Sequence, residues 1–379
     1  MVPFHRRRIY MSLKKLGFGM MRLPKVNPDD PTSIEIREVC DMVDLFLEKG
    51  YTYFDTAWMY HKFASEYAAK WALVKRHPRD SFTLATKLHE SYVTDEMTKD
   101  DVFNKQCEKC GVEYFDYYLL HAVNDTNIEN YEAKDCFSWL KDKKEAGKIK
   151  HAGFSFHGTA PMLDKILTKY PWIEFVQLQL NYLDWGSEKV QSGACYETCE
   201  KHGIPVVVME PVKGGSLANL PTRDEKLMKE YNADASIASW AIRFAATLPN
   251  VMMVLSGMSN LQQMEDNIDT YDNLKPLNDE EKAIIAKVVE DLNKGGTIPC
   301  TGCAYCKEGC PMQINIPEYF KLYNSAREDV GNQQREYDRL TLEFGKASAC
   351  IECGQCEGIC PQGLPIIDDL KDVAKYFEK

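Results

Sequence analysis

The chain has 379 residues, a formal net charge of -11 at pH 7 and 44% hydrophobic residues. We expect one large domain and one small one, because this length exceeds that of a single small domain. The acidic balance argues against binding to nucleic acid or to an anionic membrane surface, both of which attract basic proteins. No apolar stretch approaches the roughly 20 residues that a membrane-spanning helix requires. Small molecules or a redox partner protein are therefore the expected partners.

From residue 14 onward, short apolar runs alternate with amphipathic segments, a pattern typical of parallel strands joined by crossover helices. The pattern predicts eight strands, at residues 16–20, 52–56, 82–87, 114–121, 151–156, 175–180, 205–211 and 251–257. It predicts helices at residues 33–49, 98–110, 131–146, 159–169, 187–201, 234–246 and 261–272. Several of these helices end at a glycine, namely Gly50, Gly111, Gly147 and Gly203.

Eight strand–helix units over about 280 residues favour a (β/α)8 barrel over an open doubly wound sheet. No G-x-G-x-x-G opens a first helix, so the phosphate loop of a Rossmann domain is missing. Residues 1–13 are expected to form a hairpin or strand across the bottom of the barrel. Glycines and a proline in residues 293–299 predict a boundary between a barrel at 1–292 and a small domain at 293–379. Residues 316–344 are expected to form a helix pair in that small domain.

The same cysteine pattern occurs twice near the end of the chain. Cys300-x-x-Cys303-x-x-Cys306-x-x-x-Cys310-Pro311 recurs at residues 350–361. Three thiolates with this spacing bind one face of an iron–sulfur cube, and the fourth, which precedes proline, binds the neighbouring cluster. The pattern predicts two [4Fe-4S] clusters with crossed ligands, one held by Cys300, Cys303, Cys306 and Cys360 and the other by Cys350, Cys353, Cys356 and Cys310.

Zinc and disulfide bonds are the alternatives for these cysteines. Zinc needs four ligands per site and has no use for a third evenly spaced cysteine. Disulfides need an oxidising compartment, and the basic residues 5–8 are not followed by the apolar run of a secretory signal. Oxygen-sensitive clusters and 14 cysteines suggest a reducing cytoplasm. Four other cysteines, Cys107, Cys110, Cys195 and Cys199, are expected to be ordinary buried thiols.

Four polar residues lie at or just after the ends of neighbouring predicted strands. Asp55 ends the second strand, Tyr60 follows in the loop, Lys87 ends the third strand and His121 ends the fourth. The chemistry of a (β/α)8 barrel takes place at the carboxyl ends of its strands, so we expect these side chains to converge. Taken singly, each has a structural alternative: a helix cap, a core tyrosine or a structural histidine.

Together the four residues suggest acid–base chemistry on a carbonyl group. An ammonium beside a tyrosine lowers the pKa of the phenol, which is otherwise about 10, and makes Tyr60 a general acid. Asp55 can keep Lys87 charged by pairing with it. His121 can donate to a carbonyl oxygen and orient the substrate.

These residues also carry a family resemblance. Asp55-Thr-Ala-Trp-Met-Tyr60, the Ala-Thr-Lys ending at Lys87, the Tyr-Tyr-Leu-Leu-His ending at His121 and the opening LGFGMMRLP of residues 16–24 together resemble the aldo-keto reductase superfamily over about residues 14–290. The cysteine region resembles the branch of that superfamily with a C-terminal bacterial ferredoxin-like domain.

The resemblance implies a nicotinamide cofactor, preferably NADPH, that transfers a hydride to a carbonyl carbon while the tyrosine delivers the proton. It implies that Ser155 and Gln177 hold the carboxamide and that Met209 packs on the nicotinamide ring. Gly19, Met20 and Arg22, with Gly214 and Leu217, would face the ribose and pyrophosphate. Gly257, Ser259, Gln263 and Asn267 would grip the adenosine end.

The sequence departs from the family pattern at three places. Phe156 replaces a common asparagine, Met209 replaces an aromatic ring, and residues 256–259 offer no lysine or arginine for a 2′-phosphate. The choice between NADP(H) and NAD(H) therefore stays open, and so does a flavin in the barrel. The leading hypothesis is a reductase of small carbonyl or alcohol substrates. The alternative is an electron-transfer or redox-sensing protein that uses the barrel as a scaffold.

Overall fold

The computed structural model describes residues 14–294, 296–327 and 333–378. The hairpin expected at residues 1–13 lies outside the described residues. Contacts divide the chain into two compact units, one of residues 14–211 and 238–277, the other of residues 212–237 and 278 onward. The second unit thus takes in a stretch that immediately follows the seventh strand, which differs from the single boundary expected at 292/293. We describe the first as the barrel unit and the second as the cysteine unit.

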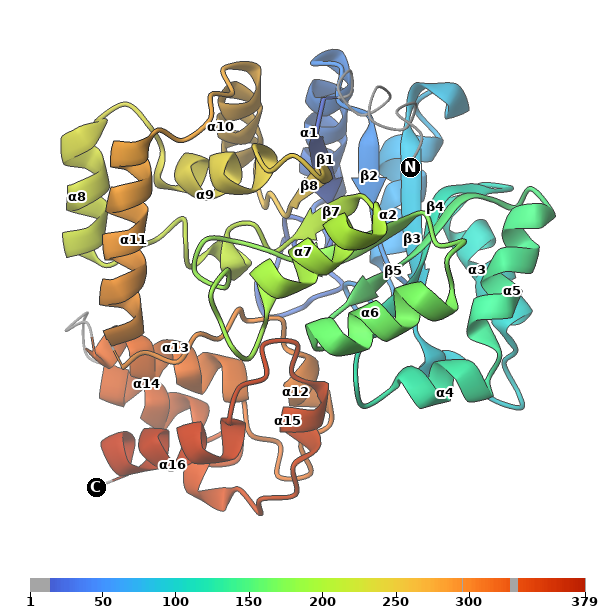
Figure 1. Ribbon diagram of the computed structural model, residues 1–379. Helices are drawn as coiled ribbons and strands as arrows, with labels where there is room; N and C mark the ends of the chain where they lie inside the picture. The colour runs from blue at the N-terminus through green and yellow to red at the C-terminus, as the bar shows by residue number, and fades with distance from the viewer. Residues whose placement is uncertain (1–13, 295, 328–332, 379) are drawn as a thin grey trace. The chain divides into compact units, whose positions relative to one another are not determined.

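The barrel unit contains eight parallel strands that pair in sequence order and close on themselves. Every predicted strand is present, and no end differs from the prediction by more than two residues. Figure 1 shows the strands surrounded by helices, as in a (β/α)8 barrel. The strands are β1 Leu16–Gly19, β2 Tyr53–Asp55, β3 Thr83–Leu88, β4 Phe115–Val123, β5 Ile149–Phe156, β6 Phe175–Gln179, β7 Val206–Met209 and β8 Val251–Ser256.

Most predicted helices of the barrel unit are also confirmed. Gly50, Gly111, Gly147 and Gly203 each have positive φ where the preceding helix ends. The helices are α1 Ile36–Glu48, α2 Ser65–Ala69, α3 Lys99–Cys110, α4 Ile128–Ala133, α5 Cys136–Glu145, α6 Ala160–Lys169, α7 Ser192–His202, α9 Ile237–Ala246 and α10 Leu261–Asp272.

The single helix expected at residues 131–146 was wrong. The chain forms α4 and α5 there, because Asp135 adopts a left-handed conformation with φ 51° that interrupts the helical hydrogen bonds. The ammonium of the preceding Lys134 contacts the carboxylate of Glu90 at 2.6 Å, which ties this turn to the segment after β3. The sequence also gave no indication of α2, whose five residues are too few to show a periodic pattern.

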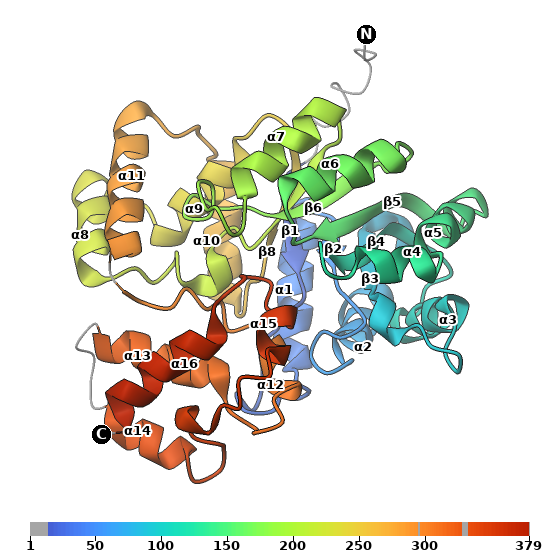
Figure 2. The same ribbon diagram turned by 60° about the horizontal axis from the view of Figure 1, so that its bottom comes forward.

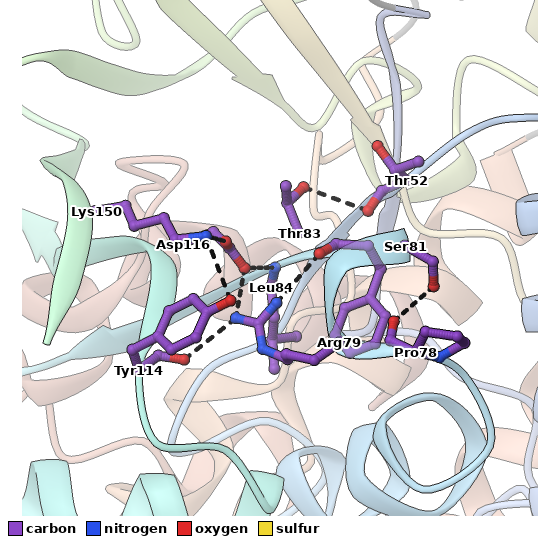
Figure 3. A network of polar contacts seen from close by, with 10 residues as sticks. Thr52, Pro78, Arg79, Ser81, Thr83, Leu84, Tyr114, Asp116 and Lys150 are labelled. Atoms are coloured by element: carbon purple, nitrogen blue, oxygen red, sulfur yellow. Dashed lines mark hydrogen bonds and ion pairs between the residues drawn. The ribbon is translucent and has the colours of Figure 1, made fainter.

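A polar network ties together the amino ends of β3, β4 and β5, opposite the catalytic end expected for a barrel (Figure 3). The buried carboxylate of Asp116 accepts from Arg79 Nη2 at 2.6 Å, from Lys150 Nζ at 2.8 Å and from the backbone N–H of Leu84 at 2.9 Å. A buried carboxylate is stable only when charges and donors replace its water. This network therefore has a structural role.

The cysteine unit is helical. Figure 2 shows α13, α14 and α16 grouped together, and their inward residues form one apolar core with half-buried Cys300, Cys310, Cys350 and Cys360 packed against it. The expected helix pair is confirmed as α13 and α14, which contact each other. The helices are α8 Thr222–Tyr231, α11 Asp279–Lys294, α12 Tyr305–Glu308, α13 Ile316–Arg327, α14 Gln333–Leu340, α15 Gln355–Ile359 and α16 Ile366–Phe377. Among the described residues, no helix is long and apolar enough to cross a membrane.

Candidate active site and cluster region

The strand register explains why the predicted site residues face one another. Asp55 pairs with Ala85, and Lys87 pairs with Leu119. Ala85 and Leu119 belong to the apolar cluster inside the barrel. Because side chains alternate along a strand, Asp55, Lys87 and His121 all point inward at the carboxyl ends of their strands. The same argument places Ser155, Gln177 and Met209 on the inner face, since Ser155 pairs with Gln177 and Gln177 with the interior Val207.

Asp55, Tyr60, Lys87 and His121 converge as expected. The wholly buried ammonium of Lys87 contacts Asp55 Oδ1 and donates to the backbone oxygen of Thr56 at 2.7 Å. The same ammonium lies 4.8 Å from the centroid of the Tyr60 ring. The Tyr60 and His121 rings meet edge to face, with centroids 5.7 Å apart. Tyr60, which comes from a loop, is therefore adjacent to both a cation and an imidazole.

Burial controls the protonation of this group. Burial lowers the pKa of Lys87, and the adjacent Asp55 carboxylate opposes that shift by favouring the ammonium. The expectation of a lowered pKa for Tyr60 was wrong. Burial raises the pKa of Tyr60 well above 10, the Asp55 carboxylate raises it further, and the charge that lowers it is that of Arg22. Tyr60 is thus held in its protonated form, as a proton donor must be.

His121 is a neutral imidazole in this environment. Burial lowers its pKa well below 6.5, and the nearby Lys87, His89 and His157 lower it further. Its Nδ1 is buried and has no hydrogen-bond partner within the described parts of the chain. A neutral imidazole can donate one hydrogen bond without adding charge beside Lys87.

The predicted carboxamide residues form a polar pair on β5 and β6. Ser155 Oγ accepts from the backbone N–H of Ala122 at 2.7 Å, which leaves its own hydroxyl proton for another acceptor. Gln177 Oε1 is buried without a hydrogen-bond partner among the described residues. A ligand amide would satisfy both groups.

The predicted adenosine segment is ordered by its own side chains. Gln263 Oε1 accepts from the backbone N–H of Ser259 at 2.8 Å, and Asn267 Nδ2 donates to the Gln263 backbone oxygen at 2.6 Å. The buried Oδ1 of Asn267 has no hydrogen-bond partner in the described chain. At β1, a Cβ on Gly19 would come within 3.3 Å of the Ser256 backbone oxygen, so Gly19 keeps the ends of β1 and β8 close.

Residues 256–259 contain no lysine or arginine, but the cationic side chain of Arg22 lies close to them. Its side chain lies 3.6 Å from the position that a Cβ on Gly257 would occupy. Arg22 Nη2 also pairs with Glu210 Oε1 at 3.1 Å. Glu210, which the sequence analysis did not select, follows β7 with a positive φ of 56°, and its backbone oxygen accepts from Asn181 Nδ2 at 3.1 Å.

Gly214 and Leu217 follow β7 in the chain, and their expected contact with the ribose and pyrophosphate stays a prediction. Both belong to the cysteine unit. Leu217 is wholly buried.

A buried polar network missed by the sequence analysis supports Lys87. Gln106 Nε2 donates to the Lys87 backbone oxygen at 2.9 Å and to Glu66 Oε1 at 2.9 Å. Glu66 also accepts from Thr86 Oγ1 at 2.8 Å and pairs with Lys109 at 2.7 Å. Glu66 and Gln106 lie on α2 and α3, and polar residues on amphipathic helices are usually interpreted as solvent-facing.

One thiol of the second cysteine run, that of Cys360, interacts with the first run. Burial raises the pKa of Cys306, and the neighbouring charges that add to this shift are those of Cys303, Cys300 and Cys360. The Cys360 charge also raises the pKa of Cys300, after burial. Cys360 is thus close to the first cysteine run, although it is the last cysteine of the second run. Burial raises the pKa of Cys356 to about 11, and the Cys350 charge contributes.

This donor set suits iron–sulfur clusters. All eight thiols are free. Among the described residues, no three His, Cys, Asp or Glu groups gather closely enough to hold a single metal ion. The other four cysteines of interest are free thiols too, with Cys110, Cys195 and Cys199 buried and Cys107 partly buried, each with its pKa raised chiefly by burial.

Comparison with known proteins identifies both parts of the chain. Residues 15–290 match the aldo/keto reductase family. The chain belongs to the aldo/keto reductase family. Residues 299–364 match the 4Fe-4S dicluster domain, so this aldo/keto reductase carries a ferredoxin-like dicluster region. Family membership makes it an oxidoreductase that acts on a small molecule.

Two known proteins are distantly similar to this aldo/keto reductase. It is 23% identical over 316 residues to the uncharacterized oxidoreductase YqkF of Bacillus subtilis, covering 75% of this chain and 95% of the relative. It is 23% identical to the 9,11-endoperoxide prostaglandin H2 reductase of Trypanosoma cruzi over 68% of this chain and 85% of that protein.

Solved structures share the barrel. The aldo-keto reductase AKR11C1 from Bacillus halodurans, in its holo form, is 25% identical with a TM-score of 0.55, over 72% of this chain and 91% of that one. An aldo-keto reductase from Klebsiella pneumoniae in complex with NADPH is 17% identical with a TM-score of 0.58, over 73% of this chain and 90% of that one. The second likeness concerns the fold alone.

Proposed function

We propose that the barrel catalyses the NAD(P)H-dependent reduction of a small carbonyl compound, or the reverse oxidation of an alcohol, with Tyr60 as the proton donor. The observation that carries the proposal is the position of Tyr60. Its ring lies 4.8 Å from the buried Lys87 ammonium and edge-on to the neutral imidazole of His121. A substrate carbonyl oxygen beside the Tyr60 hydroxyl could receive both a hydrogen bond from His121 and a proton from Tyr60.

Each of the four residues has a separate task in this reaction. Tyr60 gives its proton to the substrate oxygen as negative charge develops there, and the Lys87 ammonium stabilises the phenolate that remains. Asp55 holds Lys87 in place and compensates its charge inside the barrel. His121 orients the carbonyl. When bound, the nicotinamide supplies the hydride to the carbonyl carbon.

The nicotinamide dinucleotide is assigned to the residues that the family resemblance implies, of which Gln177 and Asn267 each have a buried oxygen without a hydrogen-bond partner among the described residues. Ser155 and Gln177 would hold the carboxamide, beside Met209. Asn267, with Ser259 and Gln263, would hold the adenosine end. Arg22 lies beside Gly257 and carries a guanidinium that can bind a phosphate in addition to Glu210, which supports NADP(H) alongside NAD(H). Gly214 and Leu217 remain proposed contacts of the pyrophosphate.

The eight thiols of the two cysteine runs would hold two [4Fe-4S] clusters with crossed ligands. The interaction of Cys360 with Cys300 and Cys306 supports this assignment. Such clusters transfer single electrons, so we also propose an electron-exchanging protein partner. Free thiols and oxygen-sensitive clusters favour a reducing, cytoplasmic location.

Electron transfer with the barrel as a scaffold is the second candidate, because two clusters suit one-electron traffic better than hydride transfer. The deciding experiment is to purify the protein without oxygen and to identify the nucleotide or flavin that accompanies it. Turnover of NADPH or NADH with a panel of aldehydes and ketones is then measured. Carbonyl reduction that Tyr60→Phe removes supports the reductase. A bound flavin with no carbonyl turnover would replace it with the electron-transfer function.

A further inference from the structure

The loop that follows β7 belongs to the cysteine unit and contains a buried lysine, Lys213. Lys213 begins a single 3-10 turn, Lys213–Gly215. Its backbone is left-handed with φ 47°, a conformation that is unfavourable for a lysine. Only 3% of the residue is exposed. Burying a lysine in this conformation costs free energy, which favours a role for the charge itself.

The Lys213 ammonium is directed at the segment after the second cysteine run. Its Nζ donates to Gln362 Oε1 at 3.0 Å. Gln362 is itself 5% exposed and stands two residues after Cys360. The charge is therefore held close to the chain segment that provides the crossed ligand.

The same loop also meets the segment that begins the first cysteine run. A Cβ on Gly214 would come within 2.4 Å of the backbone oxygen of Thr301, so the two backbones touch and only glycine fits. Thr301 follows Cys300. Two neighbouring residues of one loop thus contact two segments, and both segments belong to the same crossed ligand set.

We propose that Lys213 raises the reduction potential of the [4Fe-4S] cluster held by Cys300, Cys303, Cys306 and Cys360. Reduction adds one electron to an already anionic cluster, and a nearby buried cation stabilises the more negative state. The inference rests on the proposed ligand set and is independent of the hydride chemistry in the barrel.

The other ligand set has a different electrostatic setting. The cation beside Glu352 and the second cysteine run is Lys371, whose side chain is 55% exposed and pairs with Glu352 at 3.3 Å and Asp368 at 3.1 Å. Solvent and these carboxylates screen its charge. The buried charge of Lys213 should therefore act on its cluster more strongly than the exposed charge of Lys371 acts on the other.

The test is an anaerobic redox titration of the full-length protein with dithionite, followed by electron paramagnetic resonance. Lys213→Met removes the charge and keeps the length of the side chain, Lys213→Arg keeps the charge, and Lys371→Met is the matched exposed control. Cys303→Ser identifies the signal of the first cluster, because Cys303 is a ligand of that cluster alone in the crossed pattern.

We expect Lys213→Met to disfavour reduction of the cluster marked by Cys303→Ser by tenfold or more, which is about 59 mV for one electron. Lys213→Arg and Lys371→Met should change the equilibrium constant for reduction of that cluster by less than threefold. The proposal is overturned if Lys213→Met leaves that cluster unchanged, if Lys371→Met shifts it equally, or if the shift falls on the other cluster.

A second variant covers the case in which Lys213→Met does not assemble its clusters. Gln362→Glu leaves Lys213 in place but sets a carboxylate against its ammonium. The same cluster should then be harder to reduce, and an unchanged potential would overturn the proposal. Iron content and carbonyl turnover are measured on the same samples, so a failure of the cluster assignment or of the reductase function is seen separately from a failure of this inference.

Discussion

Arg22 and Glu210 form an ion pair of 3.1 Å between the segment after β1 and the end of β7, and their charges act in opposite directions on Tyr60. The Arg22 guanidinium lowers the pKa of Tyr60, whereas the Glu210 carboxylate raises it. Burial, the larger cause, keeps that pKa well above 10. The proton that Tyr60 donates is thus controlled by residues far apart in the sequence.

This relationship predicts the basic side of the pH profile for carbonyl reduction. Tyr60 must be protonated to act, and its raised pKa keeps it protonated up to and beyond pH 10. The kcat of the native enzyme should therefore stay constant on the basic side until the pH exceeds about 10. Glu210→Gln removes a charge that raises the pKa, so its basic limb should move to lower pH. The measurement is kcat at saturating nucleotide from pH 6 to 11. A native limb below pH 9, or an upward shift in the variant, would contradict the prediction.

Tyr60→Phe should remove carbonyl reduction while leaving nucleotide affinity almost unchanged. The variant loses the hydroxyl that donates the proton, and loss of a general acid costs about 100- to 10,000-fold in rate. Steady-state turnover and nucleotide titration by fluorescence test this. Tyr92→Phe, on the loop after β3, serves as a control that removes a hydroxyl outside the four proposed catalytic residues. Turnover of Tyr60→Phe at the native rate would refute the assignment.

Crossed ligation predicts an unusual pattern of iron loss. Cys310→Ser should damage the cluster of Cys350, Cys353 and Cys356, which is not the one nearest in sequence. Combining Cys310→Ser with Cys353→Ser should therefore remove no more iron than Cys353→Ser alone. Combining it with Cys303→Ser should empty both sites. Iron analysis and Mössbauer spectra provide the readout, and the reverse pattern would show that each run binds its own cluster.

NAD(P)H alone should not reduce the clusters at a catalytically useful rate. A nicotinamide gives up two electrons together as a hydride, whereas each cluster accepts one, and a flavin normally mediates between them. Stopped-flow absorbance of anaerobic, flavin-free protein tests this, with dithionite as the positive control and added flavin as the rescue. Rapid bleaching by NADPH in flavin-free protein would mean that the barrel and the clusters exchange electrons directly.

Asp116→Asn should destabilise the barrel without affecting catalysis. The buried carboxylate pairs with Arg79 and Lys150 and accepts from the Leu84 backbone, so its loss should cost about 2 kcal/mol of unfolding free energy. Lys150→Met is the matched control. Because Lys150 is half exposed, its substitution should cost less than about 1 kcal/mol of unfolding free energy. Thermal unfolding and kcat/KM are the measurements. An unchanged melting temperature for Asp116→Asn would argue against a structural role for this network.

Local patterns in the sequence determined a large part of this protein. The alternation of apolar runs with amphipathic segments was sufficient to find all eight strands, because a buried parallel strand leaves a short, dense hydrophobic signal. The cysteine spacing predicted the dicluster region, because ligand geometry around a cluster is set by neighbours in the chain. The interruption between α4 and α5 at Asp135 was not predicted, because a single left-handed residue does not change the periodic pattern of apolar residues.

Closure of the barrel and packing of the cysteine unit decided the rest. Arg22 and Glu210 are 188 residues apart, and Lys213 and Gln362 are 149 apart. The raised pKa of Tyr60 likewise depends on burial by distant segments. Such pairings depend on which surfaces meet, and no local period records them. The sequence by itself therefore determined the strands, the cysteine pattern and the candidate catalytic residues. Only the tertiary structure decided which charges act on Tyr60 and which loop contacts the cluster segments, because burial and long-range contact set the strength of those charges.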